Sequence, residues 1–374
     1  MRVVVAPDSF GGTLTSVEAA RAIATGWGEV APDDVLDLVP LSDGGPGFVD
    51  VVQAGLGGEM RSLSVPGPLG AATDARWLRV GTTSYVEAAQ ACGLHLVAPS
   101  DDSVRRGHTT GLGALVLAAA VDAERVVVGL GGTATNDGGA GVVRALGHQL
   151  LGPSGAPLPP GADVLRSVVA VDPAPLRWPY DAELTAATDV DNPLLGPNGA
   201  SAVYGPQKGA DRAAVLDLDD ALRRWADVVE PACGRPGLRD EPGAGAAGGI
   251  GFALLALGAT RASGLRLVAE AVGLADRVAA ADLVVTGEGT FDSQSLRGKV
   301  VAGVAAVAQQ LGVPCVVVAG QVSVGRRDAA AAGIDEAVAV AEAMGSAEAA
   351  IEAGAGGVAA AAARVARGWS RRRS

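Results

Sequence analysis

Acidic residues and glycines recur together in five short segments of the 374-residue sequence. The segments are Pro7-Asp8-Ser9-Phe10, Ser42-Asp43-Gly44-Gly45, GGTATNDGGAG at 131–141, TDVDNP at 188–193, and Gly287-Glu288-Gly289 with Asp292. Glycines let a backbone approach a ligand closely and aim successive N–H groups at an anion. Aspartates can hold Mg²⁺ and can accept the proton of a hydroxyl group. A single cluster of this kind is typical of an ordinary turn, but five of them favour a site for phosphate and a divalent cation.

Lysine and asparagine are rare in this sequence, and their positions coincide with such loop segments. The chain has 27 arginines but only two lysines, Lys208 and Lys299, each next to a glycine. All three asparagines, Asn136, Asn192 and Asn198, lie in loop motifs. Lysine is a compact point charge and arginine a planar fork, so a site that needs the former resists replacement. We therefore expect at least one lysine to be functional.

Valine-rich or short apolar runs precede the acidic segments and are typical of strands buried on both faces. The predicted strands cover residues 3–6, 125–129, 282–286 and 315–319, and shorter apolar runs cover 35–41 and 184–187. Helical patterns lie between them. Thr15 and Glu18 have the spacing of a capping box, and apolar residues repeat on one helical face from Val300 to Leu311. This alternation predicts an α/β fold with parallel sheets covered by helices.

The two ends of the chain share this βα character, whereas the middle is interrupted by Pro/Gly-rich stretches at 152–161 and 234–249. We expect a Rossmann-like parallel-sheet domain built from residues 1–62 and 280–374, with residues 63–279 inserted as a middle α/β domain. In open parallel sheets, ligands lie outside the carboxyl ends of the strands. The acidic loops are therefore expected to converge on one cleft.

The composition excludes several partners. A net charge of −12 argues against nucleic acid and anionic membranes. Three distant cysteines, Cys92, Cys233 and Cys315, indicate structural thiols in a reducing compartment. The N-terminal apolar run is too short for a signal peptide, and the uncharged stretch 243–260 is interpreted as a glycine loop followed by a buried helix. A cytoplasmic location is expected.

Three glycine motifs resemble nucleotide fingerprints but lack the required context. The segment 129–134 matches GxGxxG/A, yet no acidic residue occurs between Asp137 and Asp163 to bind a ribose. The second match, 243–248, follows prolines where a strand is needed. Gly298-Lys299-Val300 lacks the upstream glycine and the Ser/Thr of a P-loop. A P-loop enzyme is therefore excluded, and a dinucleotide enzyme is disfavoured.

Together the motifs resemble the type-1 glycerate kinase family, from about residue 2 to about residue 345. The matching pieces are APDSF (6–10), SDGG (42–45), GPLG (67–70), GGTATNDGGAG (131–141), TDVDNPLLGPNGASAVYGPQKGA (188–210), PGAGAAGGIG (242–251) and TGEGTFDSQSLRGK (286–299). The resemblance implies two α/β domains with the active site in the cleft between them. It also implies phosphorylation of D-glycerate with ATP and Mg²⁺, with 2-phosphoglycerate favoured over 3-phosphoglycerate as product. One departure is Gly11, which stands where the family commonly has lysine; another is the stretch 108–113.

The resemblance and the loop chemistry together nominate the site residues. Catalytic roles are predicted for Asp189, Asp43, Lys208 and Lys299, with Asp189 or Asp43 as the base. Metal binding is predicted for Asp292 and Glu288. Contacts to substrate or phosphate are predicted for Asp8, Ser9, Ser42, Gly44, Gly45, Gly131, Gly132, Thr133, Asn136, Asp137, Asn192, Gln207, Gly245, Gly248, Gly287 and Glu288.

Two other functions stay open at the level of sequence. An NAD(P)-dependent oxidoreductase of a small hydroxy acid would use the glycine loops differently, and a non-catalytic sugar-acid-binding protein would keep the pocket without phosphoryl transfer. The abundance of carboxylates argues against the binding protein, because unpaired charge in a cleft is costly. The expected partner is a small-molecule substrate, and the chain is expected to be a monomer or a homodimer.

Overall fold

The computed structural model describes residues 1–293, 295–296 and 299–370, which form two compact units. Unit 1 consists of residues 1–43, 50–56 and 265–374, and unit 2 consists of residues 44–49 and 57–264. Three residues of the predicted 286–299 motif, namely 294, 297 and 298, lie outside the described residues. Each unit is α/β, as the strand and helix patterns predicted.

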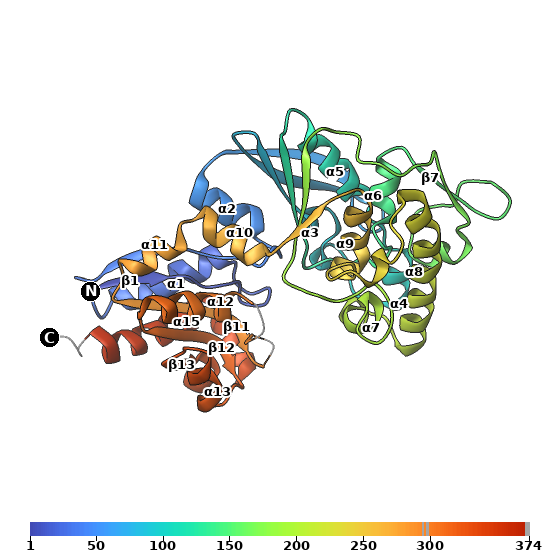
Figure 1. The fold of residues 1–374 in the computed structure, drawn as a ribbon. Helices are drawn as coiled ribbons and strands as arrows, with labels where there is room; N and C mark the ends of the chain where they lie inside the picture. Colours follow the sequence, from blue (N-terminus) through green and yellow to red (C-terminus); the bar gives the residue numbers. More distant parts are fainter. Residues whose placement is uncertain (294, 297–298, 371–374) are drawn as a thin grey trace. The chain divides into compact units, whose positions relative to one another are not determined.

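Unit 1 contains a fully parallel five-stranded sheet with the order β13-β12-β11-β1-β2. The strands are β1 (Arg2–Val5), β2 (Val35–Leu38), β11 (Leu283–Phe291), β12 (Cys315–Val322) and β13 (Glu336–Ala339). Figure 1 shows β1, from the N-terminal end, in the same unit as β11 from the C-terminal third, and the two strands pair directly. From β1 the chain proceeds to β2 on one side, whereas β11 lies on the other side. The strand order therefore reverses between β1 and β11.

Eight of the described helices belong to this unit or border it, and α1 and α15 share a core with strands β1, β11 and β12. They are α1 (Ser16–Gly28), α2 (Phe48–Leu56), α10 (Gly264–Ala271), α11 (Leu274–Ala279), α12 (Val300–Leu311), α13 (Arg326–Ala331), α14 (Val340–Met344) and α15 (Ala347–Trp369). The predicted capping box is confirmed. The Glu18 N–H donates to Thr15 Oγ1 at 3.2 Å, and the Thr15 N–H donates to Glu18 Oε2 at 2.9 Å.

Within the described part of the chain, α15 is the one helix long and apolar enough to cross a membrane. Of its apolar window, 39% is buried. Its Val358 and Val365 lie in the same core as Ile23 and Trp27 of α1. A Cβ on Gly26 of α1 would lie 1.8 Å from the Ala359 carbonyl oxygen, so the two helices pack backbone against backbone. This packing is typical of a core helix.

Unit 2 contains a mixed six-stranded sheet with the order β10-β9-β6-β5-β4-β3 and a small β7-β8 pair. Its strands are β3 (Glu59–Pro66), β4 (Ala72–Val80), β5 (Thr83–Glu87), β6 (Arg125–Gly129), β7 (Gln149–Leu151), β8 (Ala170–Asp172), β9 (Glu183–Ala187) and β10 (Thr260–Ala262). Strands β5, β6, β9 and β10 are parallel, and β3 and β4 are antiparallel additions.

The helices of unit 2 are α3 (Ala88–Cys92), α4 (Asp101–Arg106), α5 (Thr110–Ala120), α6 (Ala140–Ala145), α7 (Ala200–Tyr204), α8 (Arg212–Cys233) and α9 (Ala246–Ala256). The 243–260 stretch begins as a glycine turn, because Ala247, Gly248 and Gly249 all have positive φ. From Ile250 to Ala256 it is a buried helix, as the sequence indicated.

The observed division of the chain differs from the predicted boundaries at 62 and 280. Residues 265–279 group with unit 1 because this segment packs closely on the helices of that unit. A Cβ on Gly303 of α12 would lie 2.2 Å from Leu265 Cδ2, and a Cβ on Gly55 of α2 would lie 2.4 Å from Val272 Cγ1. Residues 44–49 group with unit 2. Short segments that pass from one unit to the other do not differ in composition from their neighbours, so the sequence does not reveal them.

Candidate active site

Three carboxylates of unit 1 lie in or after three neighbouring strands of its sheet, β11, β1 and β2. Asp8 follows β1, Asp43 follows β2, and Glu288 lies within β11. Hydrogen bonds lock the ends of β1 and β11 together: the Asp8 N–H donates to the Gly287 carbonyl at 2.8 Å, and Thr286 Oγ1 donates to the Ala6 carbonyl at 2.8 Å. Backbone pairing of neighbouring parallel strands thus gathers these acids at one edge of the sheet.

The negatively charged forms of the acids in this cluster are destabilised by burial and by one another. Burial and, next, the carboxylate of Asp43 raise the pKa of Asp8 to about 8. Burial also raises the pKa of Glu288, and the Ser295 hydroxyl and Lys299 oppose that shift. Since each shift reflects unfavourable negative charge, the cluster would be stabilised by a bound cation. Perturbed acids of this kind are typical of functional sites.

Among the described residues, Lys299 acts on this cluster with a positive charge, and it is the N-cap residue of α12. Its positive charge lowers the pKa of both Asp8 and Glu288. The start of a helix carries a partial positive charge, so this end of α12 and Lys299 reinforce one another toward an anion.

The predicted metal-binding residues lie together with this cluster. Asp292 raises the pKa of Glu288, and the buried Oε1 of Glu288 has no hydrogen-bond partner within the described structure. Among residues 1–293, 295–296 and 299–370, no three His, Cys, Asp or Glu side chains are grouped to hold a metal ion. Mg²⁺ commonly takes only one or two protein carboxylates and completes its shell with water and substrate phosphates. The residues present fit a magnesium ion held in that manner.

In unit 2 the glycine-rich loop after β6 is anchored by Asp137, which is 1% exposed. Its carboxylate accepts hydrogen bonds from Thr109 N at 2.8 Å, Thr109 Oγ1 at 2.9 Å, and the N–H groups of Gly139 and Gly141, both at 3.1 Å. Burial raises the pKa of Asp137, and these hydrogen bonds oppose the rise. The observed contacts tie the loop to the start of α6 and to the residue before α5.

Lys208 is buried beneath the same loop, with 3% of its surface exposed. Its Nζ donates to the Thr135 carbonyl at 2.7 Å and lies 3.5 Å from Thr133 Oγ1. Burial lowers the pKa of Lys208 to about 8, although Cys92 and Asp137 act in the opposite direction. A lysine with one strong bond and little hydration keeps donor capacity, so it can serve both the loop and an anion.

The glycine turn at the start of α9 lies against this loop. A Cβ on Gly248 would lie 2.1 Å from the Thr135 carbonyl oxygen and 2.9 Å from Lys208 Nζ, so glycine is required there. Asn136 donates from Nδ2 to Ser201 Oγ at 2.9 Å. Its buried Oδ1 and Thr135 Oγ1 have no hydrogen-bond partner in the described part of the chain. Polar atoms left in this state are available to a ligand or to water.

The SDGG loop is part of the same arrangement from Gly44 onward. A Cβ on Gly44 would lie 2.8 Å from the Ala187 carbonyl at the end of β9, and one on Gly131 would lie 2.6 Å from Gly45 Cα. Glu87, buried at the end of β5, accepts hydrogen bonds from Gly47 N at 3.0 Å and Val49 N at 3.4 Å. Close backbone packing and Glu87 together fix the loop that directly follows Asp43.

The loop after β9 carries Asp189 and Asn192. Both ends of the Asn192 side chain are engaged within the loop region: Nδ2 donates to the Asn198 carbonyl at 2.8 Å, and the Tyr204 hydroxyl donates to Oδ1 at 2.7 Å. Asp189 is half-buried one residue before Val190, and Gln207 is exposed in the short 3-10 helix that ends at Lys208. Asp189 therefore lies on a loop whose conformation is held by the hydrogen bonds of Asn192.

A model of the glycerate kinase family matches residues 3–370 of the chain. The chain belongs to the glycerate kinase family. Its relatives include a glycerate kinase from Halalkalibacterium halodurans, 41% identical over 340 residues, which cover 90% of this chain and 89% of the relative. A glycerate 2-kinase from Escherichia coli is 41% identical over 328 residues, covering 86% of each chain.

The fold of this glycerate kinase family member also matches a solved structure. A crystal structure assigned to a glycerate kinase 2 of Salmonella typhimurium LT2 has a TM-score of 0.78 and 35% sequence identity, covering 100% of this chain and 99% of that one. The predicted family and the α/β class are therefore confirmed. The enzyme class is that of the family's members, which are phosphotransferases.

The structure distributes the predicted residues of this family member between two groups. Unit 1 brings together one group of the predicted acids with a lysine, and unit 2 brings together the glycine loops with the second lysine. The first group comprises Asp8, Ser9, Ser42, Asp43, Gly287, Glu288, Asp292 and Lys299. The second comprises Gly44, Gly45, Gly131, Gly132, Thr133, Asn136, Asp137, Asp189, Asn192, Gln207, Lys208, Gly245 and Gly248. The roles predicted for these residues stay predictions.

Three supporting residues were missed by sequence reasoning. Glu87 braces the SDGG loop, Thr109 connects Asp137 to α5, and Ser201 holds Asn136. Their partners lie 28 to 65 residues away in the chain. A signal existed only for Thr109, which lies in the polar stretch 108–113 that departs from the family pattern.

Proposed function

We propose that this protein phosphorylates D-glycerate with ATP and Mg²⁺, and that 2-phosphoglycerate is the product. Family membership supports the substrate class, since relatives bear the names glycerate kinase and glycerate 2-kinase. The observation that carries the proposal is the cluster of Asp8, Asp43 and Glu288 with Lys299 at the strand ends of unit 1. Phosphoryl transfer demands charge neutralisation and positioning, which such a cluster supplies through a metal ion.

The acid cluster of unit 1 is suited to bind the magnesium ion and the phosphates of ATP. Glu288 and Asp292 would hold the magnesium ion, which would supply charge neutralisation for the transferred group. Lys299 and the start of α12 would pair with phosphate oxygens. Burial and the neighbouring Asp43 carboxylate raise the pKa of Asp8 to about 8, which favours its protonated form in the free protein at neutral pH. It would lose this proton as the positive charge of the magnesium nucleotide arrives.

The glycine loops of unit 2 suit the small hydroxy acid. Lys208 can pair with a carboxylate or phosphate while it holds the Thr135 carbonyl. The free oxygens of Asn136 and Thr135 add a hydrogen-bond acceptor and a hydroxyl. The N–H groups of the 131–139 loop and the 243–249 turn would supply further donors. Together these groups would bind the carboxylate and the hydroxyl groups of glycerate.

Two carboxylates are candidates for the base that takes the proton of the attacking hydroxyl. Asp189 follows β9 on a loop braced by Asn192, and Asp43 directly precedes the braced Gly44. Both sit on loops whose backbones are fixed by close packing, so either can be held within hydrogen-bond distance of a substrate. We propose that one of the two, Asp189 or Asp43, takes this proton.

A coupled ADP-release assay with purified protein tests the proposal. We expect ADP formation that requires D-glycerate and Mg²⁺ together, with weaker or no turnover of L-glycerate. Absence of ADP release with saturating MgATP and D-glycerate would refute it. Release of ADP without dependence on glycerate would indicate a different acceptor. The same preparation, incubated with NAD(P)⁺ and glycerate, is expected to show no absorbance change. We also propose that the protein acts in the cytoplasm.

A further inference from the structure

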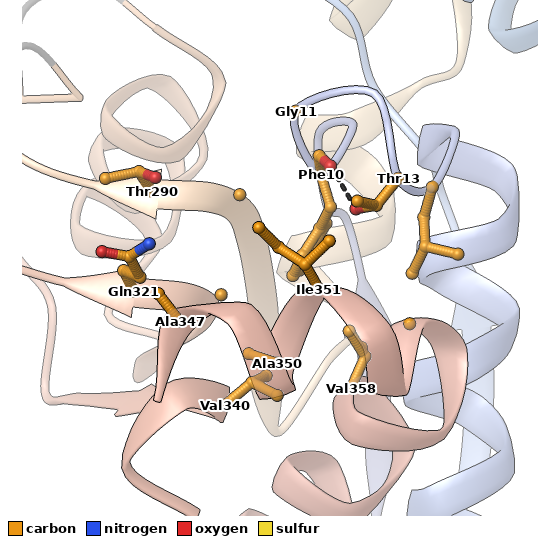
Figure 2. Close-up of a pocket in the computed structure, with 14 residues that line it drawn as sticks. Phe10, Gly11, Thr13, Thr290, Gln321, Val340, Ala347, Ala350, Ile351 and Val358 are labelled. Atoms are coloured by element: carbon orange, nitrogen blue, oxygen red, sulfur yellow. Dashed lines mark hydrogen bonds between the residues drawn. The ribbon is translucent and has the colours of Figure 1, made fainter. Parts of the chain in front are cut away.

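A small cavity opens in unit 1 beside the acid cluster. Its volume is about 120 Å³, and Figure 2 shows its lining residues. Phe10 comes from the loop after β1, Thr290 from β11, Gln321 from β12, and Ile351 from α15. Cavities that take whole drug-sized ligands measure roughly 300–1,000 Å³. This cavity therefore suits one ring system of a larger ligand, with the rest lying outside.

The cavity lies at the point where the strand order reverses. Its lining combines residues that follow β1 with residues at the ends of β11 and β12, and the reversal falls between β1 and β11. In doubly wound sheets this reversal opens a crevice in which nucleotides and related ligands bind. Asp8 lies two residues before Phe10, and Glu288 lies two residues before Thr290. A ligand with its ring in the cavity would therefore extend toward the acid cluster and Lys299.

Apolar residues form part of the cavity wall, and one of them is exposed to solvent. Ile351 is 60% exposed and lies at the centre of Figure 2, between the Phe10 loop and the strand ends. Gly354 interrupts α15 with φ 50° and ψ −127°, a conformation in which glycine is favoured. This kink separates the first turns of α15 from the rest of the helix. An exposed apolar side chain over a cavity indicates a surface that a ligand covers.

Polar groups occupy one side of the cavity. In Figure 2, Thr290 and Gln321 lie on neighbouring strands, across the cavity from Phe10 and Thr13. The Thr13 hydroxyl donates to the Phe10 carbonyl at 2.5 Å and holds the β1 loop in place. The carboxamide of Gln321 can donate and accept at once, as the edge of adenine requires.

We propose that this cavity binds the adenine ring of the nucleotide, between Phe10 and Ile351, with Gln321 reading the edge of the base. The inference rests on the proposed function, since it places the base of the ATP whose phosphates the acid cluster would meet. It identifies Gln321 as a specificity-determining residue for the base. Gly11 borders the cavity, and a Cβ there would meet nothing within 4 Å.

The test is to fill the cavity without touching the acid cluster. Ala347 lines the cavity and is half-exposed, so Ala347→Phe narrows it at little cost to folding. Ala360→Phe, on an exposed position of the same helix outside the cavity, is the matched control. Calorimetric titrations of the full-length protein with ADP and with inorganic tripolyphosphate give the dissociation constants. Thermal unfolding confirms that each variant is folded.

We expect Ala347→Phe to raise the Kd for ADP by at least about tenfold, because the ring loses its apolar contacts. The Kd for tripolyphosphate, which has no base, should stay within about twofold of wild type. Gln321→Ala should reduce the preference for ATP over GTP. An ADP affinity that is unchanged in folded Ala347→Phe would overturn the proposal while leaving the kinase function intact. If the variants change ADP binding as expected but the wild-type protein does not phosphorylate glycerate, the proposed function is refuted and the proposed base pocket is supported.

Discussion

Replacing Asp8 by asparagine is expected to stabilise the protein while abolishing its activity. The folded-state pKa of Asp8, about 8, lies above the ordinary value of 3.8. The folded state therefore binds more protons than the unfolded chain between about pH 4 and pH 8, and stability falls as the pH rises through this window. Asparagine keeps the shape and the acceptor for the Ser9 N–H, which bonds to Asp8 Oδ1 at 2.7 Å, but it carries no charge.

The magnitude follows from the shift. About four pH units at roughly 1.4 kcal/mol each set an upper bound of about 6 kcal/mol. Asp8 is partly exposed, so water and neighbouring charges relax much of this cost, and we expect a gain of about 1–3 kcal/mol at pH 8. For a unit of this size, this corresponds to a rise in Tm of roughly 2–12 °C. The gain should shrink steadily as the pH is lowered toward 4.

The assay is thermal unfolding of wild type and Asp8→Asn, followed by circular dichroism at pH 5, 6, 7 and 8, without nucleotide or metal. Asp33→Asn removes the same charge from an exposed turn and controls for net charge. Phosphoryl transfer is measured in parallel. A Tm at pH 8 that is unchanged or lower in Asp8→Asn would contradict the reasoning. So would a gain that grows at lower pH.

Four further substitutions probe unit 2 and the proton transfer. Lys208→Met should lower kcat by at least about 100-fold. Its Tm should change by only a few degrees, because the cost of burying the ammonium group offsets its hydrogen bond to the Thr135 carbonyl. An unaltered kcat would show that Lys208 does not belong to the active site. Asp189→Asn and Asp43→Asn are compared by steady-state kinetics, and loss of the base should lower kcat roughly 10²–10⁴-fold; values within a few-fold of wild type in both would show the assignment to be wrong. Gly248→Ala places a Cβ 2.1 Å from the Thr135 carbonyl, and urea unfolding should show a loss of more than about 2 kcal/mol. Gly147→Ala, which also has positive φ but meets nothing within 4 Å, should cost only about 1 kcal/mol; equal losses would contradict the steric argument.

Local patterns predicted the elements of the fold well. The valine runs at 3–6 and 315–319 became the central strands β1 and β12 because both faces of the sheet are covered. The capping box at Thr15 is a contact between residues three apart, so its spacing alone suffices. The helix after the 243–249 glycine turn was likewise visible, since apolar length and glycine content are local properties.

The environment of the candidate residues was not predictable in the same way. Lys208 is polar in the sequence, and only the packing of the loop and the Gly248 turn around it makes it buried with a pKa of about 8. Asp137 is a predicted ligand contact, and its observed hydrogen bonds to the N–H groups of Thr109 and Gly141 gave no signal in the sequence. Glu87 gave no signal, because its partners lie 38 and 40 residues earlier in the chain. Burial and long-range hydrogen bonds are set by tertiary packing, which spacing in one sequence does not record.

Phosphorus NMR of the reaction mixture tests the central claim most directly. Wild-type protein with MgATP and D-glycerate should convert ATP to ADP with equal formation of one phosphomonoester. Its resonance should be split into a doublet by a single methine proton, as 2-phosphoglycerate requires. A triplet from a methylene group would identify 3-phosphoglycerate and contradict the assigned product. The appearance of no phosphomonoester, or of inorganic phosphate alone, would contradict the proposed glycerate kinase activity itself.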